Sequence, residues 1–182
     1  MSEVRPSYGA ELLARIRTLR IRTLLQPPGR YWLATVARLV LGGVFIAAGA
    51  VKVGDLSASG RAVAAYRLLP FDVAMFVGTV QPFVEIALGV LLVLGLGTRL
   101  AAVISGLMLI AFTIAIVSAW IRGLRIDCGC FSRGGDLAAG ERTQYLSATI
   151  RDIALLFAAG FLALFPRSRL SLDDKLLDGG RT

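Results

Sequence analysis

The stretch that decides the fold is LAAVISGLMLIAFTIAIVSAWI, residues 100–121, which contains no charged side chain. A helix rises about 1.5 Å per residue, and the hydrocarbon core of a bilayer is roughly 30 Å thick. An uncharged apolar run of this length is therefore long enough to cross a membrane as one helix. We predict that residues 100–121 form a transmembrane helix.

Three further apolar stretches flank this one, at about residues 32–51, 73–96 and 145–165. The hydrophobic fraction of the chain is 56% and its mean hydropathy is +0.72. Average soluble domains are less apolar than this. We therefore expect an all-α integral membrane protein, a four-helix bundle that occupies residues 32–166.

The segments outside this domain are more polar. In residues 1–31, apolar side chains such as Leu12, Ile16 and Leu19 recur at three- and four-residue steps between arginines. This pattern predicts a basic amphipathic helix in the membrane interface, and the alternative is a plain positive topology flank. We expect a polar tail at residues 167–182, no cleaved signal peptide, and a short surface helix at residues 62–69.

The distribution of positive charge predicts the orientation of the four spans. Both termini fall on one side, and the richer side is expected to be cytoplasmic. That side carries eleven basic residues and the other seven. We therefore expect a plasma-membrane protein with cytoplasmic termini and with residues 122–144 outside the cytoplasm.

The net charge of +8 has the same explanation. The basic residues lie mainly in the termini and the short loops, which is typical of topology signals and lipid-headgroup contacts. Membrane lipid is therefore the expected partner, and nucleic acid is not. The sequence gives no indication of the oligomeric state.

Cys128 and Cys130 are the only cysteines, and the chain has no histidine. This inventory is too small for a typical four-ligand zinc site, so we expect no metal. A disulfide across a single glycine closes a tight and strained ring, and strained disulfides exchange readily. Nearby arginines would stabilise a thiolate, whereas Asp127 would oppose it. The alternatives are a permanent disulfide or two idle thiols.

Glu85 lies deep within a predicted span, where a carboxylate is costly unless it is paired or protonated. We expect Arg38 as its first-choice partner and Arg151 as its second. Gln81 lies one turn away on the same face and would extend a polar line toward the cysteines. These residues, Glu85, Arg38 and Gln81, are candidates for a proton relay, and the alternative is an ion pair that only packs helices.

A second polar group lies near the outer ends of the spans. Asp127, Lys52, Arg151 and Asp152 are candidates for a supporting cluster beneath the cysteine loop. The alternative is that the long basic side chains only extend to the lipid headgroups.

Several short motifs together resemble the MauE family, a branch of the DoxX-like four-helix membrane proteins. The resemblance covers roughly residues 32–166 and is carried by the following residues: Arg38, Gly42, Phe45, Gly49 and Lys52 in the first span, the run from Tyr66 to Pro70, Pro82, Glu85 and Gly89 in the second span, and the run from Asp127 to Phe131. Two positions depart from the family pattern: Ser132 stands where glycine is frequent, and Asp152 where asparagine is frequent.

The resemblance implies a thiol–disulfide role. MauE proteins are thought to support production of the disulfide-rich small subunit of methylamine dehydrogenase, so the implied partner is an extracytoplasmic thiol or disulfide protein. By analogy with quinone-linked disulfide-generating enzymes, an electron pair would pass to either a quinone or a second protein. The chain would then be a thiol–disulfide oxidoreductase. The alternatives are a non-enzymatic membrane scaffold with a structural disulfide and, with less support, a small-solute transporter.

Overall fold

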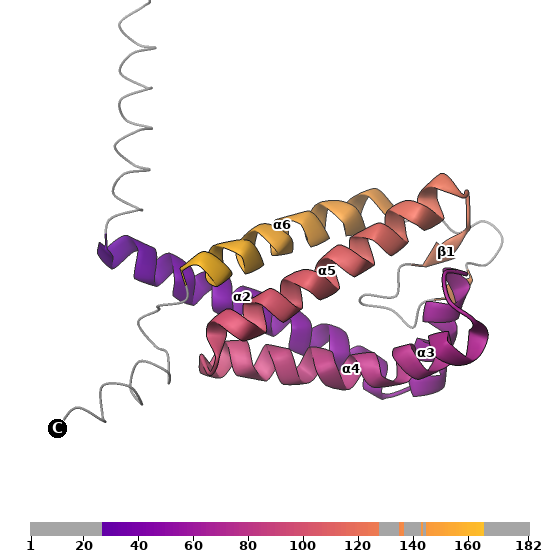
Figure 1. Ribbon diagram of the computed structural model, residues 1–182, viewed down its shortest axis with the longest axis horizontal. Helices are drawn as coiled ribbons and strands as arrows, with labels where there is room; N and C mark the ends of the chain where they lie inside the picture. The colour runs from indigo at the N-terminus through magenta and orange to yellow at the C-terminus, as the bar shows by residue number, and fades with distance from the viewer. Residues whose placement is uncertain (1–26, 128–134, 137–142, 144, 166–182) are drawn as a thin grey trace, which may run out of the picture.

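The computed structural model describes residues 27–127, 135–136, 143 and 145–165 (Figure 1). Four of its helices are long and apolar enough to cross a membrane. The prediction of an all-α, four-helix, multi-pass membrane protein is confirmed. The described elements are α2 (Pro27–Val53), α3 (Leu56–Ala65), α4 (Phe71–Leu94), α5 (Thr98–Ile121), the two-residue strands β1 (Ile126–Asp127) and β2 (Gly135–Asp136), and α6 (Tyr145–Leu164).

The long helices form a bundle in which each contacts two others. α2 packs against α4 and α6, while α5 packs against α6 and α4 (Figure 1). α3 lies against α4 at the end of the bundle that also carries β1 and β2. We call this end, defined by α3, β1 and β2, the α3 end. At the opposite end, Gly95 and Gly97 adopt positive φ values of 72° and 55° and allow the tight turn from α4 to α5.

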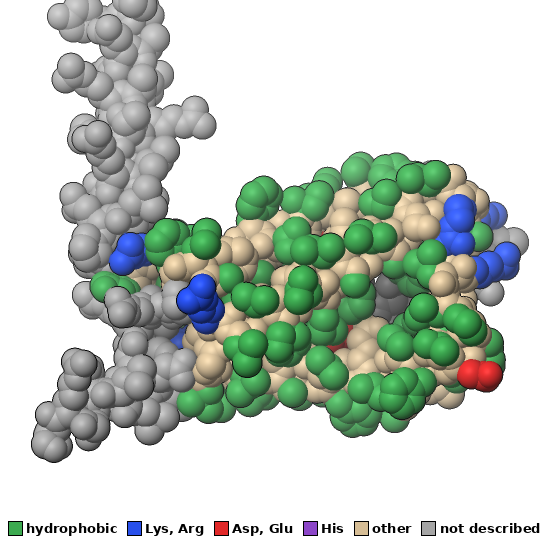
Figure 2. Space-filling view, in the orientation of Figure 1, with side chains coloured by type: hydrophobic (Ala, Val, Ile, Leu, Met, Phe, Trp, Pro, Cys, Tyr) green, Lys and Arg blue, Asp and Glu red, His purple; other side chains and the backbone are tan. Residues whose placement is uncertain are grey.

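Apolar side chains occupy both the inside and the outside of the bundle. Leu41, Leu92 and Leu162 are fully buried, whereas Ile121 is 81% exposed and Phe157 is 76% exposed. Figure 2 shows apolar side chains spread over the helices, with the charged ones gathered at the two ends. A soluble protein rarely exposes so much apolar surface, and lipid would cover it here.

Small residues bring α2 and α4 into close contact. A Cβ atom on Gly42 would lie 2.8 Å from the carbonyl oxygen of Gly89, and one on Gly49 would lie 2.6 Å from that of Pro82. Small residues at such positions allow helix backbones in membranes to approach one another closely. The two contacts also fix the register of the antiparallel pair, which determines the side chains that meet in the candidate site.

The structure places the short helix of the first loop earlier than the sequence prediction of residues 62–69. α3 begins after Asp55, whose side chain accepts a hydrogen bond from the backbone N–H of Ala58 at 2.9 Å. An aspartate at this position caps the first turn and so starts a helix there. The helix ends at Ala65, because Arg67 has a φ of 52° and leaves the helical path.

The first span also begins earlier than predicted. α2 starts at Pro27, five residues before the expected residue 32. Proline is well tolerated in the first turn of a helix, where its missing N–H has no intrahelical partner to lose. The predicted interfacial helix in residues 1–31 falls mostly on residues that lie outside the described part, as does the tail at residues 167–182.

The glycine contact can be tested with two adjacent positions. Gly42→Ala should lower the free energy of unfolding by about 1–3 kcal/mol, because the new methyl group would overlap the α4 backbone. Gly43→Ala is the matched control, since a Cβ there has nothing within 4 Å. Thermal unfolding in detergent measures both, and equal midpoints for the two variants would contradict the close contact.

Candidate functional site

A buried ion pair joins α2 to α4. Lys52, in the last turn of α2, donates hydrogen bonds from Nζ to both carboxylate oxygens of Glu85, at 2.7 Å and 2.9 Å. Gln81 donates a third, from Nε2 to Glu85 Oε1 at 2.9 Å. Lys52 is only 9% exposed and Glu85 only 2%. The carboxylate is therefore paired and hydrogen-bonded, which is the condition for burying a charge.

This pairing corrects the prediction that Arg38 would be the first partner of Glu85. The register of α2 against α4 places Glu85 near the level of Ile46, about 9 Å along the axis from Lys52 and about 12 Å from Arg38. Side chains also lean toward the N-terminus of their own helix. Lys52 therefore leans toward Glu85, whereas Arg38 leans away from it. Arg38 is itself buried, with 1% of its surface exposed.

A second ion pair lies next to the first. Arg151 donates to Asp152 Oδ1 from Nε at 3.1 Å and from Nη2 at 3.0 Å. Asp152 is 2% exposed, and its Oδ2 has no hydrogen-bond partner among the described residues. Both ion pairs line one small cavity of about 30 Å³. A space of this size, with the charged groups of both ion pairs on its wall, can hold a water molecule, which would satisfy the second carboxylate oxygen.

A short ladder joins the two ends of segment 128–134. Ile126 pairs with Asp136 and Asp127 with Gly135, in antiparallel register. Tyr145 supports this ladder from α6: its hydroxyl donates to the carbonyl of Leu124 and accepts from the N–H of Ile126 at 3.2 Å. Cys128 and Cys130, the predicted reactive residues, belong to this segment and lie outside the described residues.

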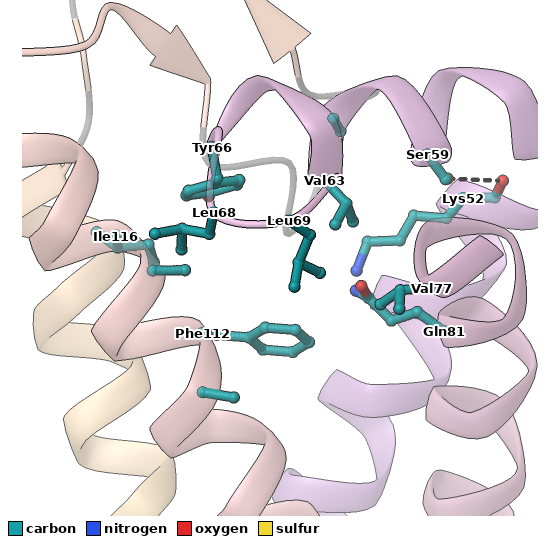
Figure 3. A pocket seen from close by; sticks show the side chains of 13 residues that line it. Lys52, Ser59, Val63, Tyr66, Leu68, Leu69, Val77, Gln81, Phe112 and Ile116 are labelled. Carbon is teal, nitrogen blue, oxygen red and sulfur yellow. Dashed lines mark hydrogen bonds between the residues drawn. The ribbon is translucent and has the colours of Figure 1, made fainter. Parts of the chain in front are cut away.

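A larger cavity of about 280 Å³ lies at the α3 end, between α3, α4 and α5. In Figure 3, Val63, Leu69 and Phe112 border the open space, and Lys52 and Gln81 reach it from the opposite side. The lining is mostly apolar, and Lys52 also lines the small cavity beside the ion pairs. One lysine therefore borders both spaces.

The wall of this larger cavity includes the turn after α3. Arg122, at the end of α5, donates from Nη2 to the carbonyl of Tyr66 at 2.5 Å and from Nη1 to that of Arg67 at 3.4 Å. These bonds hold the turn in which Arg67 has its positive φ. As a result, this turn places Leu68 and Leu69 on the cavity wall.

Comparison with known proteins agrees with this architecture. The family model described as "Methylamine utilisation protein MauE" matches residues 30–165. The chain belongs to the MauE family. A MauE relative from Paracoccus denitrificans, "Methylamine utilization protein MauE", is 31% identical over 143 residues, which is 78% of this chain and 77% of the relative. No solved structure matches this MauE chain.

The structure brings together five of the residues selected from the sequence of this MauE protein. Four of them form the two ion pairs that line the small cavity, Lys52–Glu85 and Arg151–Asp152. The fifth is Gln81, which donates a hydrogen bond to Glu85. Arg38 lies nearer the opposite end of α2, and the structure does not describe the Asp127 side chain.

Sequence reasoning missed two residues that shape the site. Tyr145 resembled an ordinary first residue of a span, and Arg122 was considered only as one of the arginines that would stabilise a thiolate. The sequence offered only a weak signal for these contacts. Each residue is a side chain with hydrogen-bond donors at the end of a span, next to a loop whose backbone carbonyls need donors.

Removal of one partner tests the ion pair. Lys52→Met should lower the free energy of unfolding by about 3–5 kcal/mol, because it leaves the Glu85 carboxylate buried without its cation. The double variant Lys52→Met/Glu85→Gln should recover part of this loss. Thermal unfolding in detergent measures both, with Arg61→Met on the exposed face of α3 as the control. The pair would be energetically unimportant if Lys52→Met behaved like Arg61→Met.

Proposed function

We propose that this MauE-family protein exchanges thiols and disulfides with an extracytoplasmic protein through Cys128 and Cys130. In one direction, a partner thiolate attacks one sulfur of the Cys128–Cys130 disulfide and forms a mixed disulfide, which releases the other cysteine as a thiolate. A second partner thiol then displaces the first cysteine. The partner gains a disulfide, and the pair gains two electrons and two protons. The same steps in reverse order reduce a disulfide of the partner.

The observation that carries this proposal is the anchoring of segment 128–134. This segment contains both cysteines of the chain, and the β1–β2 ladder and the Tyr145 hydroxyl tie its two ends to the bundle. An exchanging pair must meet a partner protein repeatedly in the same orientation. A loop whose base is fixed to α6 satisfies that need better than a loop with free ends.

The buried charges give a second line of support. Thiol–disulfide exchange moves protons as well as electrons, so a nearby acid–base group is useful to it. Gln81 lies one turn closer to the α3 end than Glu85 and donates to it. The relay of protons through Glu85, Gln81 and Arg38 remains a prediction, and the geometry favours Lys52 over Arg38 as the cation that contacts the carboxylate.

The family name suggests the biological setting. The Paracoccus relative is named for methylamine utilization. We infer that the partner of this protein is a disulfide-containing protein of a comparable oxidative pathway, whose maturation requires disulfide formation or correction. A membrane scaffold with a permanent Cys128–Cys130 disulfide is the competing function.

The partner must reach the cysteines, so the proposal includes an orientation. The positive-charge distribution favours cytoplasmic termini in the plasma membrane, with β1 and β2 on the outer side. That compartment permits disulfides. α3 contacts β2, so α3 lies on the same side as the cysteine segment in this orientation.

Trapping tests the exchange. In Cys130→Ala, the Cys128 thiolate can still attack a partner disulfide, but no second cysteine of the pair is left to release the partner, so the mixed disulfide should accumulate and appear as a larger species on a non-reducing gel. The double variant Cys128→Ala/Cys130→Ala is the control and should give no such species. The proposal fails if neither Cys130→Ala nor the converse variant Cys128→Ala traps a partner and the double variant retains full function in cells.

The reduction potential of the Cys128–Cys130 pair distinguishes thiol–disulfide exchange from a scaffold with a permanent disulfide. Free-thiol titration of the purified full chain in glutathione or dithiothreitol buffers gives the reduction potential of the pair. An exchanging pair should have a potential above about −300 mV, and a structural disulfide a potential below it.

Orientation is tested with single cysteines in a Cys128→Ser/Cys130→Ser background. Ser57→Cys on α3 should react with a membrane-impermeant maleimide added to intact cells. Arg99→Cys, in the first turn of α5 at the opposite end, should react only after the membrane is opened. Both positions are exposed, so accessibility differs only by side. The reverse labelling pattern would place the termini outside.

A further inference from the structure

The cavity at the α3 end combines an apolar body with a polar corner. Its walls are mostly apolar and include the aromatic rings of Tyr66 and Phe112. Lys52 and Gln81 supply the nitrogen atoms at one side, and Figure 3 shows the ends of both side chains close together there. An apolar site with a few convergent polar groups is typical of pockets that bind small molecules.

The polar corner offers hydrogen-bond donors. A lysine ammonium has three N–H donors, and two of those on Lys52 are directed to the two oxygens of Glu85. The Gln81 amide has two, and one is directed to Glu85 Oε1. One donor on each side chain therefore remains for a ligand, and the matching ligand group is an oxygen acceptor such as a carbonyl.

The charge balance favours a neutral ligand. Glu85 pairs with Lys52 at 2.7 Å, and Asp152 pairs with Arg151 at 3.0 Å, so the nearby charges cancel in pairs. An anionic ligand would add an uncompensated charge to a buried site, which is costly. A neutral carbonyl compound accepts the same hydrogen bonds without that cost.

The size and position of the cavity restrict the ligand further. A cavity of about 150 Å³ is known to hold one benzene ring, so about 280 Å³ accommodates a substituted ring. The lining residues Leu68, Leu69 and Val77 are 49%, 44% and 38% exposed in the bundle, on surfaces that lipid would cover. A ligand would therefore enter from the bilayer.

We propose that this cavity binds a neutral, lipid-soluble ring compound of the quinone class, whose carbonyl oxygen accepts hydrogen bonds from Lys52 Nζ and Gln81 Nε2. The ring would lie against Phe112 and Tyr66, since aromatic faces favour flat partners. The inference goes beyond the proposed thiol exchange and does not require it. The described residues that line the cavity belong to α2, α3, α4, α5 and the turn after α3, and there is no cysteine among them.

Binding of decylubiquinone to the purified full chain in phosphatidylcholine nanodiscs tests this proposal. Equilibrium dialysis gives the dissociation constant, and the unfolding midpoint should rise with ligand concentration, because a ligand that binds only the folded state stabilises it. Decylbenzene has the same tail and no carbonyl oxygen, so it should bind roughly tenfold more weakly. Excess phosphatidylethanolamine should not displace the quinone.

Two variants test the location of the site. Ala115→Phe places a ring inside the cavity and should abolish binding, whereas Ala154→Phe, an exposed position on α6 away from the cavity, should leave binding unchanged. Gln81→Leu removes one donor with little change in volume and should weaken binding roughly tenfold. It also serves as the informative variant if Ala115→Phe does not fold.

Quinone binding can be tested independently of thiol exchange, because a variant without cysteines can be assayed for binding. The Cys128→Ser/Cys130→Ser variant should bind decylubiquinone as tightly as the unaltered chain. The inference is wrong if decylbenzene binds as tightly as the quinone, if phosphatidylethanolamine displaces the quinone, or if Gln81→Leu and Ala115→Phe both bind normally. None of these outcomes would bear on whether Cys128 traps a partner.

Discussion

The ion pair between Lys52 and Glu85 is the constraint on which the rest of the structure depends. Two charges this deep in an apolar bundle are tolerated only with close contact and further hydrogen bonds, because each loses its water. The pair therefore depends on the register of α2 against α4, which brings Lys52 within reach of Glu85. The glycine contacts at Gly42 and Gly49 hold that register, so backbone packing and buried charge support each other.

The membrane-spanning part of the fold was predictable from the sequence, because long apolar runs have few alternatives in a bilayer. Glu85 was also identifiable, since a carboxylate within such a run is conspicuous. Its partner was not, because the choice between Lys52 and Arg38 depends on how two helices align. Contacts such as those of Gly42 with Gly89 and of Gly49 with Pro82 fix that alignment, and they appear only in the assembled structure.

The loop regions were harder to predict for a different reason. The helix expected at residues 62–69 was chosen for its apolar residues, whereas the cap at Asp55 decided where α3 begins. Tyr145 and Arg122 act through their contacts with backbone carbonyls of distant segments. Such contacts have no periodicity that a sequence pattern reveals, so they appear only when the helices are assembled.

Lys52, like Phe112, borders both the larger cavity and the small one beside the ion pairs. Two of its N–H donors go to the Glu85 carboxylate, and the third is the one that would face an occupant of the larger cavity. Such an occupant would therefore change the electrostatic field at Glu85, and a change in the Lys52–Glu85 pair would change the affinity for the occupant by the same factor. Lys52 would thus link the two cavities thermodynamically, with no movement of a helix required.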